Sequence, residues 1–139
     1  MISEKGFILE NGTEMPFLGF GTYLVQEEKI ILDALDCGYR HIDTAQAYGN
    51  EAGVGEGIRR SGIPREEIFV TSKVAAEHKS YATAAQSIHQ TLTTMGLDYV
   101  DLMLIHSPQP WAEVNQSDNR YFPENRQVWR ALEDALSAG

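Results

Sequence analysis

Three side chains of different chemistry stand where apolar segments of the chain end. Asp43, Lys73 and His106 each close a segment rich in apolar and β-branched residues, and Tyr48 follows Asp43 by five residues. Acidic, basic and imidazole groups cost free energy to bury. In parallel sheets and barrels, ligands bind at the carboxyl ends of the strands. We therefore expect an acid, an amine, an imidazole and a phenol to share one edge of a sheet.

Together these four groups can deliver a proton. A tyrosine with its ordinary pKa near 10 is a poor acid at neutral pH unless a nearby cation stabilises the phenolate. Lys73 can supply that cation, and Asp43 can hold the ammonium group in place. His106 can then donate a hydrogen bond to a substrate oxygen and orient it. A purely structural interpretation, in which strand ends carry polar residues to meet the solvent, explains any one member more easily than all four.

Apolar strands alternate with amphipathic helices through most of the chain. The patterns predict strands at 18–22, 39–43, 68–73 and 100–106 and helices at 27–37, 50–61, 81–95 and 123–139. The last three strands begin about thirty residues apart, which is the length of one βα unit. Before them, residues 7–17 form a predicted hairpin with a two-residue turn at Asn11-Gly12. The alternation predicts an α/β fold with a parallel sheet covered by helices.

Composition excludes several classes of protein. The 139 residues are 42% hydrophobic and 22% charged, as in a single globular domain large enough to bury a core. The excess of acidic residues, 20 against 11 Lys and Arg, disfavours binding to nucleic acid or to anionic membranes. One cysteine, Cys37, fits a reducing, cytoplasmic setting. His78 and His89 lack the spacing of metal ligands, so we expect no metal site.

The motifs resemble those of the aldo-keto reductases. The segment GYRHIDTAQAYGNE at 38–51 looks like the most recognisable signature of that family, and IFVTSK at 68–73 and LIHSP at 104–108 look like its next two. The opening LGFGTY at 18–23 also fits, and the bacterial members that reduce sugar-derived or small dicarbonyl compounds look closest. The resemblance implies an eight-fold (β/α)8 TIM barrel. Residues 1–139 would supply the N-terminal half of that single domain, with the β-hairpin inside 1–17 and the first four βα units.

The resemblance also implies an activity, the NADPH-dependent reduction of an aldehyde or ketone to an alcohol. Tyr48 would be the general acid, Lys73 would lower its pKa, Asp43 would pair with Lys73, and His106 would position the carbonyl. The expected cofactor-binding residues are Gly21, Thr22 and Asp43. The expected substrate-binding residues are Tyr23, Ala47, Ala75, His106, Ser107 and Trp111. Tyr23 and Ser107 replace tryptophans common among relatives, and Ala75 replaces a bulky residue, so we expect a wider, more polar pocket.

The family holds its cofactor mainly through the second half of the barrel. We therefore expect these 139 residues to be a truncated part of a longer, monomeric reductase, inactive or nearly so alone. A natural half-barrel would need a second copy or a complementing half to cover its open strand edges. One alternative is a truncated or half-barrel non-catalytic binding module that lacks the cofactor-binding residues of the second half of the barrel. Another is a doubly wound nucleotide binder, but Leu24 stands where the last glycine of its G-x-G-x-x-G fingerprint belongs.

Overall fold

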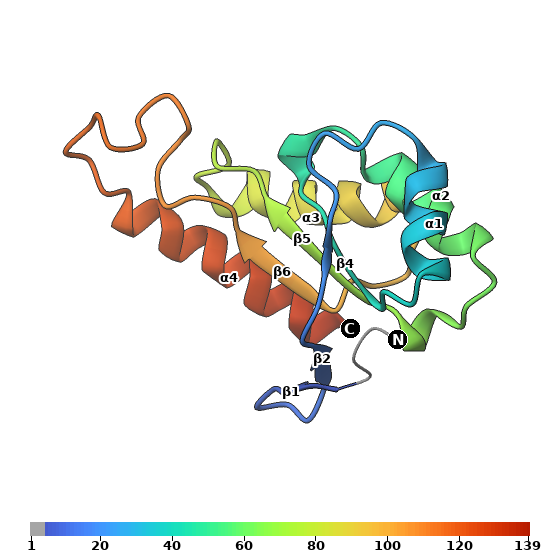
Figure 1. The fold of residues 1–139 in the computed structure, drawn as a ribbon. Coiled ribbons are helices and arrows are strands. Elements are labelled where there is room, and N and C mark those ends of the chain that lie inside the picture. Colours follow the sequence, from blue (N-terminus) through green and yellow to red (C-terminus); the bar gives the residue numbers. More distant parts are fainter. Residues whose placement is uncertain (1–4) are drawn as a thin grey trace.

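The computed structural model describes residues 5–139 (Figure 1), so residues 1–4 of the predicted hairpin segment 1–17 lie outside the described part. The strands are β1 (Gly6–Ile8), β2 (Glu14–Pro16), β3 (Phe20–Gly21), β4 (His41–Asp43), β5 (Phe69–Val74) and β6 (Leu102–Ile105). The helices are α1 (Glu28–Asp36), α2 (Glu51–Arg60), α3 (Tyr81–Met95) and α4 (Phe122–Ala138), with 3-10 turns η1 (Gln46–Tyr48) and η2 (Arg65–Glu67). Every predicted element is present, and the strands differ more from their predicted bounds than the helices do.

The N-terminal hairpin has a longer connection than predicted. β1 pairs antiparallel with β2. The Leu9 amide donates to the Thr13 carbonyl and the Gly12 amide donates to the Leu9 carbonyl, both at 2.8 Å. The loop therefore contains three residues, 10–12, and the prediction of a two-residue turn was wrong. Gly12 takes the left-handed conformation (φ 84°) that closes such a three-residue loop. Figure 1 shows the hairpin beyond the ends at which the parallel strands begin.

The main sheet is parallel, and its strands follow chain order, β3-β4-β5-β6. The register pairs Ile42 with Val70 and Val74 with Ile105. Because side chains alternate between the two faces of a strand, these four residues share one face. The helices pack against that face alone. A doubly wound sheet carries helices on both faces and reverses its strand order, so the fold excludes that alternative.

Two apolar clusters fill the space between the sheet and its helices. The first gathers residues of α1, α2 and α3 over β4 and β5: Ile31, Leu35, Ile42, Val54, Ile58, Ile68, Val70 and Met95. The second gathers residues of α3 and α4 over β5: Val74, Ala84, Ile88, Val128 and Ala131. Removing this apolar surface from water is the main free-energy gain of folding. The clusters fix the position of each strand end, and hence of the side chains that follow.

Candidate active site

The face of the sheet that carries no helices holds the polar residues singled out in the sequence. The register pairs Gly21 with Asp43 and Lys73 with Leu104, on the face opposite Ile42 and Val74. Asp43 ends β4 as predicted, whereas Lys73 is the penultimate residue of β5. His106 directly follows β6, and its amide still donates to the Val74 carbonyl at 3.1 Å. The three side chains thus meet at the carboxyl edge of the sheet.

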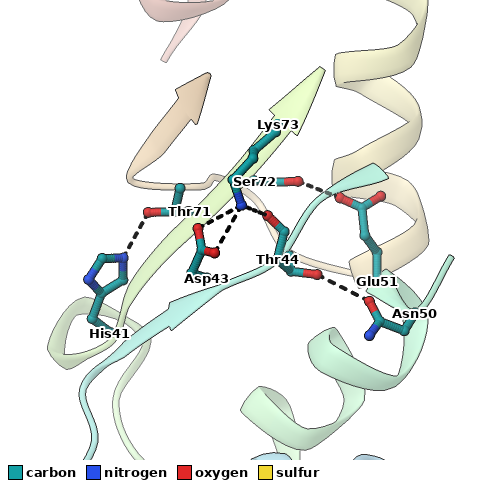
Figure 2. Close-up of polar contacts among 8 residues, drawn as sticks. All are labelled: His41, Asp43, Thr44, Asn50, Glu51, Thr71, Ser72 and Lys73. Carbon is teal, nitrogen blue, oxygen red and sulfur yellow. Dashed lines mark hydrogen bonds and ion pairs between the residues drawn. The ribbon is translucent and has the colours of Figure 1, made fainter. Parts of the chain in front are cut away.

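Lys73 and Asp43 form the centre of this cluster (Figure 2). The Lys73 ammonium donates to both carboxylate oxygens of Asp43, at 2.8 and 2.9 Å, and to the Thr44 carbonyl at 2.8 Å. Three acceptors match the three N–H groups of an ammonium. The Lys73 side chain is 13% exposed and that of Asp43 is 34% exposed. The positive charge is therefore fixed in position and screened from water on most sides.

Tyr48 lies directly over this ammonium group. The Lys73 Nζ is 5.1 Å from the centre of the Tyr48 ring, within the range of a cation–π contact. The His106 ring contacts the phenol ring edge to face, with centroids 5.7 Å apart. Tyr48 is the last residue of η1, and Gln46 anchors this turn. Its side-chain oxygen accepts from the Ala75 amide at 2.8 Å. The structure therefore brings together all four predicted catalytic residues.

The environment of His106 favours a neutral imidazole. Burial lowers the pKa of His106 below its ordinary 6.5, and the positive charge of Lys73 lowers it further. The carboxylates of Asp43 and Glu77 oppose this shift and are outweighed. A neutral imidazole has one N–H donor and one acceptor. Within residues 5–139 the buried His106 Nδ1 has no hydrogen-bond partner.

Aromatic side chains border the cluster on two sides. The Tyr23 ring is 5.2 Å from that of Tyr48, and the Trp111 ring is 5.0 Å from that of His106. Both are well exposed, at 65% and 46%. Together with Tyr48 and His106 they form one continuous row of ring contacts, which can cover the apolar parts of a small ligand.

The other predicted substrate residues differ in exposure. Ala47 is exposed in η1, and Ala75 is half-buried directly after β5. Ser107 is buried, and its hydroxyl accepts from the Gln109 amide at 3.3 Å. Ser107 is therefore less accessible to a ligand than Ala47 is.

The predicted cofactor residues lie beside Asp43. Gly21 is exposed, and a Cβ built on it would meet no atom within 4 Å. Thr22 is fully buried and its amide donates to the Asp43 carbonyl at 2.9 Å. The buried Thr22 hydroxyl has no hydrogen-bond partner in the described part of the chain. The surface here is open above Gly21 and bounded by the partly exposed Asp43 carboxylate.

Sequence reasoning missed two supporting residues at the start of α2 (Figure 2). The Asn50 amide donates to the Thr22 and Val25 carbonyls at 2.7 and 3.0 Å, which fixes the loop that carries Tyr23. Glu51 is buried on the helix side of the sheet and accepts from the Ser72 hydroxyl at 2.6 Å. Their only signal in the sequence was their place within the segment 38–51.

Within residues 5–139, none of the helices combines the length and the apolar composition of a membrane span. In the same residues, no group of three or more His, Cys, Asp or Glu side chains is placed to hold a metal ion.

The parallel sheet with helices on one face, and the cluster of polar side chains at its carboxyl edge, define an α/β protein with a candidate active site at that edge. Residues 18–139 match the Aldo/keto reductase family. The chain belongs to this family, whose members are oxidoreductases that reduce carbonyl compounds and generally use NADP(H). The resemblance found in the sequence is confirmed.

Curated relatives and solved structures support the assignment. The chain is 41% identical to glyoxal reductase of Bacillus subtilis and 42% identical to morphine 6-dehydrogenase of Pseudomonas putida, each over 94% of this chain. It spans 45% and 42% of those relatives, so less than half of their length. A crystal structure of an aldo/keto reductase from Brucella melitensis matches with a TM-score of 0.87 and 34% identity, covering 100% of this chain and 50% of that one.

A second solved structure carries a ligand. The aldo-keto reductase of Bombyx mori in complex with NADP matches with a TM-score of 0.81 and 30% identity, over 99% of this chain and 48% of that one. These structural neighbours are TIM-barrel proteins of the same family, which agrees with the parallel α/β fold of this chain.

Proposed function

We propose that this chain supplies the catalytic residues of an NADPH-dependent reductase of aldehydes and ketones. One observation carries the proposal. The Lys73 ammonium is held by both oxygens of Asp43 and lies 5.1 Å from the ring of Tyr48, which His106 contacts in turn. A phenol next to a fixed cation and a neutral imidazole suits proton donation to a carbonyl oxygen. Membership of the aldo/keto reductase family supports the same chemistry.

Each of the four residues has a distinct part in this proposal. Tyr48 donates its hydroxyl proton to the substrate oxygen. The Lys73 ammonium stabilises the phenolate left behind, and Asp43 keeps that ammonium in place. His106, neutral at pH 7, donates a hydrogen bond that orients the carbonyl. Burial of the cluster strengthens these interactions because few water molecules compete for them.

Gly21, Thr22 and Asp43 fit the reactive end of NADPH, which supplies a hydride when bound. The open surface above Gly21 leaves room for a flat ring, and the buried Thr22 hydroxyl next to it has no hydrogen-bond partner within residues 5–139. We assign the remaining cofactor contacts to barrel segments outside residues 1–139. In this proposal the chain forms the hairpin and the first four βα units of a (β/α)8 barrel, the N-terminal half of one domain, and is inactive or nearly so alone.

The substrate class proposed is a small or sugar-derived carbonyl compound. Tyr23 and Trp111 form the walls of its site, with Ala47 and Ala75 leaving room beside them. Similarity to glyoxal reductase of Bacillus subtilis favours a small substrate. We further propose a cytoplasmic enzyme, monomeric when its barrel is complete.

Replacing Tyr48 by phenylalanine tests the proposal. In the complete enzyme, Tyr48→Phe removes the proton donor and keeps the ring, so we expect kcat to fall by at least about 10²-fold with NADPH binding retained. The measurement follows NADPH oxidation at 340 nm with a small dicarbonyl substrate. Tyr39→Phe is the matched control, because Tyr39 packs on Phe20 instead of Lys73. Near-normal turnover by Tyr48→Phe would show that another group delivers the proton.

A further inference from the structure

The loop between β6 and α4 is built around one buried amide side chain. Gln109 is 4% exposed. Its Nε2 donates to the Ser117 carbonyl at 3.0 Å and to the Asn119 carbonyl at 2.7 Å. Its Oε1 accepts from the Asn115 amide at 3.3 Å. One side chain therefore satisfies three backbone groups spread over the far part of the loop.

The start of the same loop is tied to its neighbours. Lys79, in the loop after β5, donates to the Ser107 carbonyl and to Asn125 Oδ1, each at 2.9 Å. The Asn125 amide donates in turn to the Pro108 carbonyl at 2.8 Å. The base of the loop is thus fixed to α4, and the buried Gln109 follows this base directly.

Trp111 comes two residues after Gln109, and its indole contacts the His106 ring at a centroid distance of 5.0 Å. The Trp111 side chain is 46% exposed, and the Trp111 backbone amide makes a long contact, 3.4 Å, with the Glu77 carboxylate. We propose that Gln109 is a positioning residue that holds Trp111 against His106 and thereby determines which carbonyl substrates bind well. The kinetic part of this inference rests on the proposed function, whereas the positioning of Trp111 does not.

The test uses a nearly isosteric change. In Gln109→Glu, the side chain facing the Ser117 and Asn119 carbonyls loses at least one of its two donors, because an ionised carboxylate donates to neither carbonyl and a protonated carboxyl donates to only one. Gln116→Glu is the matched control, because Gln116 lies exposed in the same loop and its substitution adds the same charge. Circular dichroism and the melting temperature establish that both variants fold.

The first measurement needs no turnover. A protonated imidazole quenches an indole that it contacts, so Trp111 fluorescence in the 139-residue chain carrying Trp129→Phe reports His106. The charged groups around that imidazole are Lys73, Asp43 and Glu77. We expect fluorescence to fall as the pH decreases below about 6.5, the ordinary histidine pKa. The change should disappear in His106→Gln.

Gln109→Glu should reduce the amplitude of this pH-dependent change at least about twofold, because an indole that samples several rotamers contacts His106 for only part of the time. Gln116→Glu should retain the full amplitude. A full amplitude in Gln109→Glu would overturn the inference, because Trp111 would then stay against His106 without the Gln109 hydrogen bonds.

The second measurement uses the complete enzyme. We expect Gln109→Glu to raise KM by about tenfold with kcat changed by less than about twofold. The unsatisfied buried carbonyls would displace Trp111 at the side of the substrate site, whereas the proton donor Tyr48 would stay in place. In a Trp111→Ala background, Gln109→Glu should raise KM no further. Additive effects on KM would overturn the inference. If the unmodified enzyme reduces no carbonyl compound, the proposed function fails, and the fluorescence result still decides the role of Gln109.

Discussion

Two carboxyl groups on opposite faces of the same sheet show how surroundings determine the behaviour of one functional group. Asp43 stands on the helix-free face, paired with the ammonium of Lys73. Glu51 lies on the helix side, where its hydrogen-bond donors are the neutral hydroxyls of Ser72 and Thr91. Burial therefore raises the pKa of Glu51 above its ordinary 4.5, and the two hydroxyls offset only part of that shift. Asp43 holds an ammonium group in the cluster, whereas the charge of Glu51 costs stability.

The raised pKa of Glu51 predicts how stability changes with pH. Because its folded pKa lies above the unfolded one, stability is lost as pH rises from about 4.5 through the folded pKa. Glu51→Gln keeps an acceptor for Ser72 and does not titrate. We expect it to raise Tm by roughly 2–4 °C relative to the unmodified chain at pH 8, and this advantage to vanish at pH 4.

Thermal unfolding at pH 4, 6 and 8 measures this difference. Burial lowers the pKa of His41 and of His106, which reduces stability as pH falls, but both chains share that effect and it cancels. Glu66→Gln, at an exposed position in η2, is the control and should change Tm equally little at every pH. An equal change in Tm from Glu51→Gln at pH 4 and pH 8 would contradict the raised pKa.

The central residues of the site could be predicted from their places in the sequence, and their supports could not. Asp43, Lys73 and His106 each end an apolar segment, so a parallel sheet had to bring them to one edge. Glu51 and Gln109 carry no such signal. Glu51 bonds to Ser72, 21 positions away in the chain, and Gln109 bonds to backbone carbonyls of a loop without periodicity. Such contacts depend on the folded path of the chain.

At the scale of elements, the sequence pattern predicted the bounds of helices more accurately than the bounds of strands. α3 has the predicted bounds, because its apolar positions and Ser80 cap are local features. The observed strand β6 is shorter than the predicted strand 100–106, because pairing with β5 determines where β6 begins and ends. Val100 lies outside the sheet and packs against the first apolar cluster. The buried hydroxyl of Thr91 in α3 was also unforeseen, because its partners are Gln46 of η1 and Glu51 of α2.

The packing of α2 on the end of α3 depends on a helical glycine. A Cβ on Gly55 would lie 2.5 Å from the Met95 Cα and overlap the adjacent carbonyl, a backbone contact that cannot move aside. We expect Gly55→Ala to destabilise the chain by about 1–3 kcal/mol, although alanine favours a helix. Gly53→Ala, in the same helix with open space at its Cβ, should be neutral or stabilising by up to about 1 kcal/mol. Urea unfolding of both variants measures the difference. Equal stabilities would mean that α2 and α3 do not pack this closely.

At the scale of the whole molecule, the two faces of the main sheet differ in composition: one packs in the apolar core and the other carries the candidate site. Its helix-bearing face holds the apolar clusters, and its other face holds Lys73, Asp43 and the open surface above Gly21. Under the proposed function, the chain presents few groups to NADPH, and its net charge of -9 opposes the approach of the cofactor phosphates.

We therefore expect the 139-residue chain to bind NADPH with a Kd weaker than about 100 µM, corresponding to a binding free energy of about -5.5 kcal/mol. Titration of NADPH fluorescence at two salt concentrations measures it, with the complete enzyme as the reference. Screening the repulsion with salt should strengthen any residual binding, whereas attraction between phosphates and basic side chains would weaken with salt. Saturation at low micromolar NADPH, weakened by salt, would place a phosphate-binding group within these residues. At least some of the cofactor contacts that we assign to the rest of the barrel would then belong to residues 1–139.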